Sequence, residues 1–458
     1  MHTASDDIPV LICEENHSLH SVCIDGIQSC PKCGNQLYPC PHSHSNDVSS
    51  LCSPENASRQ VNVDTVATGD HVLSSQCLVD EPREPGNTKA IVMERIETNV
   101  RWDALKQSVK QIIDLLFEGC ERLHLYDKSI QKEGAIAIAE VLKVNKSVTT
   151  LNLGSNVIEK EGAMALAEAL KVNQSISCLD LRANSIQKEG AIALAEAIKV
   201  NITVRYLDLR YNFIQKEGAV AIAEALKFNH VIATLNLSSN YINNEGAVAL
   251  ADAIKVNQTL SNLNVYNNCI SQDGIIALAE ALTVNHSITH LVLSANSIEK
   301  EGTIALAEAL KVNQSIVVLD LCDNPIHKEG AIALAEALKV NQTVASLYFF
   351  NNFIQKEGAI ALAEALKVNK SISTLYLRCN FIRKEGAIAL AEALKINESI
   401  MSIDIGGNSI RNEGAIALAE ALKVNHTVTS LQLDNNCIRN EGENALKSTG
   451  NTVVKIGF

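Results

Sequence analysis

Apolar and polar positions repeat along most of the chain with a fixed spacing of 28 residues. A Glu-Gly pair, once Asp-Gly, marks each copy. Its glycine falls at Gly134, Gly162, Gly190, Gly218, Gly246, Gly274, Gly302, Gly330, Gly358, Gly386, Gly414 and Gly442. A period of 20–50 residues is typical of stacked units that cannot bury their apolar faces alone. The pattern therefore predicts one long array in place of about three ordinary domains.

Each copy joins a strand pattern to a helix pattern. Leu151 and Leu153 alternate with polar residues, which is typical of a short strand with one buried face. Asn156 follows where the chain turns, and its amide can satisfy backbone groups there. The residues after Gly162 are strong helix formers, and Asn173 can end this helix because Asn tolerates the left-handed cap conformation.

This unit resembles the leucine-rich repeat of the ribonuclease-inhibitor subtype, in which each unit pairs one strand with one full helix. The resemblance covers residues 120–442 and is strongest to the repeat region of NOD-like receptors of the C3 type. The Ran GTPase-activating proteins are similar too. The resemblance implies an α/β solenoid, or horseshoe, with a parallel sheet on the concave side and helices on the convex side. The first copy departs from the pattern at Cys120 and Lys128.

Both ends of such an array need a cap. Residues 99–119 place Leu105, Val109, Ile112 and Leu116 at helical spacing, which predicts an N-terminal capping helix; an interaction motif is the other interpretation. Residues 443–458 end in TVVKIGF and are expected to form the C-terminal cap, with a final strand.

Composition bears on partners and compartment. The net charge of −13 argues against general binding to nucleic acid. The chain has no 18-residue apolar stretch and no basic segment at its start, so we expect no membrane segment and a cytoplasmic, intracellular protein. Its 13 cysteines should then be reduced or metal-bound. Asn-x-Ser/Thr sequons recur where helices lead into strands, and we interpret their Asn residues as caps.

Residues 1–44 carry Cys and His at spacings that suit tetrahedral zinc. The candidate ligands are Cys13, His17, His20, Cys23, Cys30 and Cys33. This stretch resembles the latter part of a RING finger, which implies one complete Zn2+ site at Cys13, His17, Cys30 and Cys33 and half of a second site at His20 and Cys23.

The opening Cys pair of a RING finger is missing before residue 13, and with it the apolar residue that holds the ubiquitin-conjugating enzyme. A late start of the chain, a degenerate module, a knuckle completed by Cys40, His42 and His44, and free thiols in a disordered tail all stay open. Residues 45–98 are rich in Ser, Asn, Asp and Pro, which predicts a flexible acidic linker.

Strand positions that should face the concave side vary between copies, whereas scaffold positions barely change. One group of variable residues is Asp180, Arg182, Tyr206, Asp208 and Arg210. The other is Asp320, Tyr348, Phe350, Tyr376 and Arg378. Tyr and Arg are enriched at binding hot spots, so we expect both groups to bind a protein partner. Neutral drift and solvation of the sheet are the other interpretation. Phe349 should instead fill the core in place of Leu.

No phosphate-binding loop or catalytic arrangement stands apart from the repeat. The first hypothesis is therefore a non-enzymatic interaction scaffold or sensor. The alternatives are a RING-type ubiquitin ligase, with the repeats as substrate receptor and a ubiquitin-conjugating enzyme as second partner, and a GTPase activator of the Ran-activating type.

Overall fold

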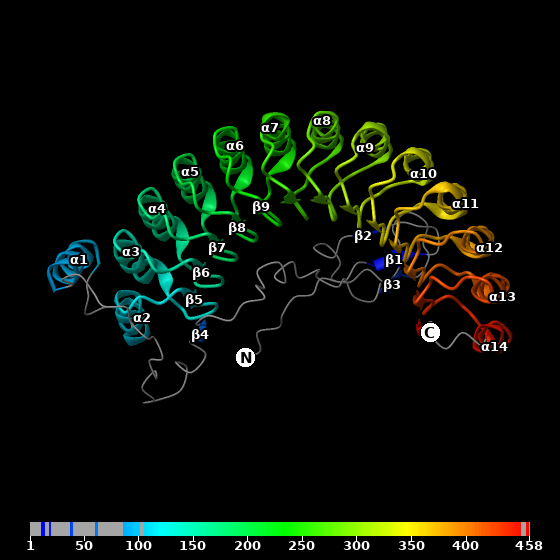
Figure 1. Ribbon diagram of the computed structural model, residues 1–458, viewed down its shortest axis with the longest axis horizontal. Helices are drawn as coiled ribbons and strands as arrows, with labels where there is room; N and C mark the ends of the chain where they lie inside the picture. The colour runs from blue at the N-terminus through cyan, green and yellow to red at the C-terminus, as the bar shows by residue number, and fades with distance from the viewer. Residues whose placement is uncertain are drawn as a thin grey trace. The chain divides into compact units, whose positions relative to one another are not determined.

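The computed structural model describes residues 11–13, 18–19, 37–39, 60–62, 86–100, 105–449 and 455–457. The chain divides into two units, Met1–Ala57 and Ser58–Phe458. In the first unit, β1 (Leu11–Cys13) pairs antiparallel with β2 (Ser18–Leu19) and with β3 (Leu37–Pro39). The second unit contains the repeat array (Figure 1).

The described strands of the second unit form one parallel sheet of 14 strands in chain order. β4 (Gln60–Asn62) pairs with β5 (Arg122–His124) at one end, and β17 (Lys455–Gly457) pairs with β16 (Ser430–Gln432) at the other. The strands between them are β6 (Thr150–Asn152), β7 (Cys178–Asp180), β8 (Tyr206–Asp208), β9 (Thr234–Asn236), β10 (Asn262–Asn264), β11 (His290–Val292), β12 (Val318–Asp320), β13 (Ser346–Tyr348), β14 (Thr374–Tyr376) and β15 (Ser402–Asp404).

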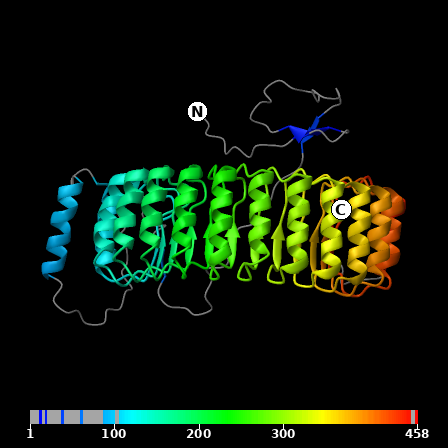
Figure 2. The same ribbon diagram turned by 90° about the horizontal axis from the view of Figure 1, so that it is seen from above.

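One helix follows each repeat strand, and successive helices pack side by side (Figure 2). The repeat helices are α3 (Gln131–Leu142), α4 (Glu159–Leu170), α5 (Gln187–Ile198), α6 (Gln215–Leu226), α7 (Asn243–Val256), α8 (Gln272–Leu282), α9 (Lys300–Val312), α10 (Lys328–Val340), α11 (Gln355–Val368), α12 (Arg383–Leu394), α13 (Arg411–Leu422) and α14 (Asn440–Lys447). Within this unit the strands line the inner side of the arc and the helices its outer side (Figure 1), so the predicted leucine-rich solenoid is confirmed. None of the described helices is long and apolar enough to cross a bilayer.

The glycine of each Glu-Gly pair lets neighbouring helices approach closely. A Cβ atom added at Gly246 would lie 2.9 Å from the Cβ of Ala219 on the preceding helix. That separation is too short for two methyl groups. The Gly and Ala positions therefore fix the helix spacing, and the strand Leu residues and helix Leu or Ile residues fill one continuous core between the layers.

Two buried ladders of Asn side chains hold successive repeats together. At the end of the strand, Asn240 accepts hydrogen bonds from the backbone N–H groups of Asn212 and Ile214 and donates to three carbonyl oxygens. At the end of the helix, Asn257 donates to the carbonyl oxygens of Leu226 and Asn229, each at 2.8 Å. It also accepts from two backbone N–H groups of its own turn. The sequon Asn residues thus cap the turn through their side chains, as expected. The expected left-handed cap conformation is wrong, because Asn257 has extended backbone with φ −79° and ψ 119°.

The N-terminal end of the array carries two helices. α2 (Gln107–Phe117) buries Val109, Ile112, Ile113 and Leu116 against the first repeat. α1 (Gly86–Asn99) packs against α3, with Val92 and Ile96 in the core. The expectation of a flexible linker over residues 45–98 is therefore wrong for residues 86–98. Val92 and Ile96 are four residues apart, so they share one helical face that the array covers.

Candidate functional site

The candidate site lies on the open face of the strands. Leu347 and Phe349 point into the core, and Phe349 is the largest fully buried side chain among the described residues, as expected of a core replacement for Leu. Tyr348 and Phe350 alternate with them and are partly exposed on the opposite side. Since side chains alternate along a strand, Tyr348 and Phe350 face the concave side of the array.

Asp and Asn residues in the middle of these strands have a structural role that the sequence pattern did not reveal to us. In seven copies the side-chain Oδ1 atom accepts a hydrogen bond from the backbone N–H two residues further on. These residues are Asn152, Asp180, Asp208, Asn236, Asn264, Asp320 and Asp404. For the Asp residues, Oδ2 takes no part in this backbone bond and is the oxygen that Arg182 and Arg210 contact in their copies.

In the first predicted group, Asp and Arg residues pair with each other. Arg182 contacts Asp180 Oδ2 at 2.9 Å, and Arg210 contacts Asp208 Oδ2 at 3.1 Å. Arg182 also reaches across Gly154 and places its guanidinium carbon 5.5 Å from the ring centre of Tyr126. The structure thus brings this group together, but its charges are largely satisfied within the chain.

Asp208 is fully buried in this first group. Burial raises the pKa of its carboxyl group to about 6, and the neighbouring Asp180 acts in the same direction, while Arg210 opposes both. Tyr206 donates a long hydrogen bond of 3.4 Å to Asp208 Oδ2.

In the second predicted group, three residues from three adjacent strands lie in one row. Asp320, Tyr348 and Tyr376 are direct neighbours in the register of β12, β13 and β14. The two tyrosine rings meet edge to face, with centroids 4.9 Å apart. Asp320 is only 7% exposed, and its Oδ2 accepts a hydrogen bond of 3.2 Å from the Ser294 hydroxyl. Burial raises the pKa of Asp320.

Arg378, the fifth member of this second group, points away from the tyrosines. Its guanidinium forms two parallel hydrogen bonds with Asp434, the first at 2.7 Å, and lies 4.0 Å from Asp404. This pair passes over Gly406, two residues after β15, where a Cβ atom would lie 2.5 Å from Arg378 Nη1. The expectation that Arg378 joins the aromatic residues is therefore wrong, because the gap at Gly406 lets it reach Asp434.

Three residues that we did not predict border the second group. Asp323 follows β12 at a positive φ of 55°, and Asn351 donates to its carboxylate at 2.9 Å. Burial raises the pKa of Asp323 to about 6. Burial, with the nearby Asp323 carboxyl, raises the pKa of Tyr266 to about 12. Burial raises the pKa of the Cys322 thiol as well.

The strand-end Asn ladder is interrupted at this same place. The Oδ1 atoms of Asn352 and Asn380 are buried and accept no hydrogen bond within the described part of the chain. In the copy before Asn352, Pro325 changes the turn, and the Ile326 N–H bonds to the Asn324 carbonyl at 2.7 Å instead. Beside the second group, two acceptor atoms of the ladder therefore have no donor, although both Asn side chains still donate to carbonyl oxygens.

The predicted zinc ligands lie outside the described residues, except for the backbone of Cys13 at the end of β1. Among the described residues, no three His, Cys, Asp or Glu side chains gather so that they could hold a metal ion.

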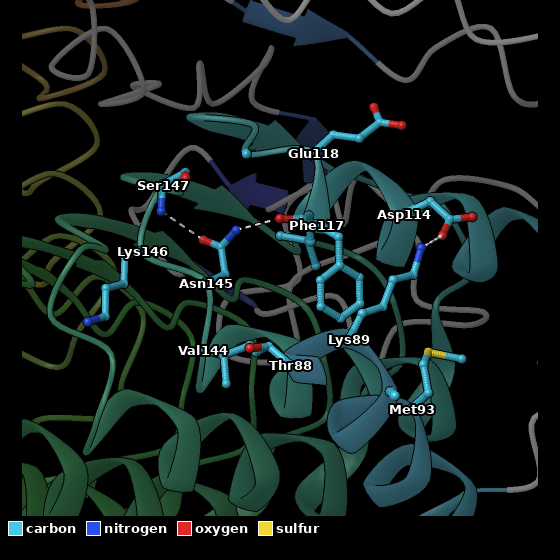
Figure 3. Close-up of a pocket in the computed structure, with 13 residues that line it drawn as sticks. Thr88, Lys89, Met93, Asp114, Phe117, Glu118, Val144, Asn145, Lys146 and Ser147 are labelled. Carbon is cyan, nitrogen blue, oxygen red and sulfur yellow. Dashed lines mark hydrogen bonds and ion pairs between the residues drawn. The ribbon is translucent and has the colours of Figure 1, made fainter. Parts of the chain in front are cut away.

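A hollow of about 1080 Å3 opens between α1, α2 and the turn after α3 (Figure 3). Lys89 on α1 forms a 3.0 Å ion pair with Asp114 on α2 and lies 5.2 Å from the ring centre of Phe117. Asn145 donates to the Leu116 carbonyl at 2.6 Å. These polar groups bond across the hollow, so we assign it to the N-terminal cap.

Comparison with known proteins finds one family. A family model described as the NLRC3 LRR domain matches residues 95–455. No curated protein shows significant similarity to the chain. Among solved structures, the leiomodin-1 actin-binding site 2 is 23% identical with a TM-score of 0.29, covering 33% of this chain and 88% of its own.

Two further structures are similar over longer stretches. The leucine-rich repeat-containing protein LegL7 from Legionella pneumophila is 20% identical with a TM-score of 0.38, covering 57% of this chain and 85% of its own. A chain of the yeast Rad7 and Elc1 complex is 14% identical with a TM-score of 0.38, covering 81% of this chain and 94% of its own.

Proposed function

Because the chain belongs to the family of NLRC3 leucine-rich repeat domains, we propose that it is a non-enzymatic interaction module that binds a protein partner on the concave face of its sheet. One observation carries the proposal. Tyr348, Phe350 and Tyr376 present partly exposed aromatic side chains on two adjacent strands of that face, in an array whose scaffold positions barely change. Aromatic side chains dominate binding hot spots because they bury large area at low entropic cost.

The aromatic residues support binding better than the Asp-Arg group does. Asp180 and Asp208 already hold Arg partners from their own strands. A partner would have to break these pairs to use their charges, and breaking a half-buried pair costs free energy. The rings of Tyr348, Phe350 and Tyr376 can be covered by a partner without breaking an ion pair. Truncating hot-spot side chains costs about 2 kcal/mol each, so the loss of all three should weaken binding at least about 100-fold.

Affinity capture from a cell extract tests the proposal. Full-length protein is compared with a variant carrying Tyr348→Ser, Phe350→Ser and Tyr376→Ser. The matched control carries Val284→Ser, Val312→Ser and Val340→Ser, which removes three exposed apolar side chains near the C-terminal ends of neighbouring helices. Circular dichroism checks that all proteins fold.

We expect a partner that binds wild type and the valine control but not the aromatic variant. A partner retained by the folded aromatic variant would refute the concave-face proposal.

A ubiquitin ligase is the alternative that the Cys and His spacing of residues 13–33 favours. In that case Zn2+ would be held by the predicted ligands, and a ubiquitin-conjugating enzyme would be a second partner inside the cell. It requires two zinc ions per chain and autoubiquitination in a reconstituted reaction. Metal content without ubiquitin transfer would leave the interaction module as the function. The Ran-type alternative requires faster GTP hydrolysis by a small GTPase in the presence of the chain.

A further inference from the structure

Asp320 differs from the other Asp residues at its strand position. Asp180 and Asp208 pair with the Arg two residues further on, and Asp404 lies 4.0 Å from Arg378. Two residues after Asp320 the chain has Cys322 instead. No Lys, Arg or His within the described ranges forms an ion pair with Asp320, whose only side-chain donors are the Ser294 hydroxyl and the Cys322 thiol.

The first group shows which kind of side chain binds to an Asp carboxylate at this strand position. There the Arg182 guanidinium donates to Asp180 Oδ2 at 2.9 Å while it lies over the Tyr126 ring. Carboxylate and aromatic ring together suit a planar cation, because the guanidinium donates in its plane and stacks through its face. Asp320 has its own aromatic neighbours, Tyr348 and Tyr376, in the same row of the sheet.

The two oxygens of Asp320 have different tasks. Oδ1 accepts the backbone N–H of Cys322 at 3.0 Å, which is the structural bond that other copies also make. Oδ2 accepts the Ser294 hydroxyl at 3.2 Å, and the Cys322 thiol also donates to this carboxylate. Two carboxylate oxygens offer about four acceptor positions, so these three neutral donors leave room for a charged one. A positively charged donor at this buried carboxylate, beside two aromatic rings, would form a charge-assisted hydrogen bond, which is stronger than a hydrogen bond between neutral groups.

We propose that Asp320, with the rings of Tyr348 and Tyr376, receives an arginine side chain of the protein partner. The inference rests on the proposed function and specifies the chemistry of the partner at that surface. Arginine fits better than lysine, since an ammonium group cannot stack on a ring and form in-plane hydrogen bonds at the same time.

Two substitutions test the site in the full-length chain. Asp320→Asn removes the charge and should keep the fold, because Asn152, Asn236 and Asn264 stand at the same position and make the same backbone bond. Cys322→Arg supplies an internal arginine, as Arg182 does for Asp180. Ser238→Arg is the matched control; it adds the same charge at the same repeat position, where Asn236 replaces Asp.

The probe is a phage library of random 12-residue peptides, selected on immobilised wild type. We expect the bound peptides to share an arginine. Asp320→Asn, Cys322→Arg and replacement of that arginine by uncharged citrulline should each weaken binding by at least about tenfold. Citrulline should cause no further loss on Asp320→Asn, since both changes remove one interaction. Ser238→Arg should bind as wild type does.

The outcomes separate the two proposals. The selected peptides could bind wild type without needing an arginine and yet fail to bind the variant with Tyr348→Ser, Phe350→Ser and Tyr376→Ser. That result would overturn this inference and leave the proposed function standing. Peptides that bind all variants equally, or no selected peptide at all, would overturn both. Lysine-containing peptides that bind as tightly as arginine peptides would overturn the choice of arginine.

Discussion

The strand-end Asn ladder offers a matched pair of substitutions, Asn240→Ala and Asn352→Ala. Both side chains are fully buried at the same repeat position. Asn240 makes five side-chain hydrogen bonds, two as acceptor and three as donor. Asn352 makes two, both as donor, and its Oδ1 atom has no partner among the described residues. The same substitution therefore removes different numbers of bonds.

The expected difference follows from that count. A buried hydrogen bond contributes about 1 kcal/mol net to stability. Asn240→Ala should then cost about 5 kcal/mol locally and Asn352→Ala about 2 kcal/mol, a difference of about 3 kcal/mol. Each also removes the same few side-chain atoms, so the cavity terms largely cancel.

Amide hydrogen exchange is the suitable assay, because long repeat arrays open locally and lose two-state behaviour. In Asn240→Ala the amides of Asn212 and Ile214 lose their acceptor, and their exchange should accelerate by about 100-fold or more. In Asn352→Ala the amide of Asn324 should exchange as in wild type. Equal acceleration in both variants would refute the claim that the ladder is interrupted at Asn352.

Three further predictions concern charge and metal. Gly406→Ala should separate Arg378 from Asp434 and lower the free energy of unfolding by about 1–3 kcal/mol. Because an ion pair is lost, the stability measured by urea unfolding should depend less on salt concentration than in wild type. An unchanged salt dependence would contradict this. Burial raises the pKa of Asp323 from 3.8 to about 6, so its carboxyl group must lose a proton in the folded state as pH rises from about 4 to 7. The free energy of unfolding should therefore fall by up to about 3 kcal/mol over this range, and Asp323→Asn should abolish that fall. Parallel pH profiles of the free energy of unfolding for wild type and Asp323→Asn would argue against it. Native mass spectrometry should find zinc in the full-length chain, removable by chelator; a metal-free spectrum would reject the N-terminal zinc site.

The fold could be predicted from the sequence because every repeat carries the residues that determine it. A period of 28 residues with fixed Leu, Asn, Gly and Ala positions leaves one architecture, and Phe349 could be assigned to the core because it stands where the other copies have an aliphatic residue. α1 was not predicted, since it lies outside the period and its buried face is short, with Val92 and Ile96 in the core and Met93 packed against it.

The pairing of the site residues was harder to predict. Arg378 and Asp434 are 56 residues apart, and their contact depends on the missing side chain of Gly406 between them. Sequence proximity had placed Arg378 with Tyr376 instead. The backbone bond of the mid-strand Asp and Asn residues did leave a signal, because these two residue types fill seven of the twelve positions. Of these seven residues only Asp180, Asp208 and Asp320 entered our prediction, as members of the two recognition groups.

Side-chain footprinting of the complex with a captured partner tests the central claim most directly. Hydroxyl radicals oxidise exposed aromatic and sulfur-containing side chains, and mass spectrometry locates the products. The account predicts that Tyr348, Phe350 and Tyr376 lose reactivity in the complex, while Phe228 and Met164, exposed on helices or their ends, keep theirs. Unchanged reactivity of the three aromatic residues, with protection confined to the helices or to residues 1–57, would contradict it.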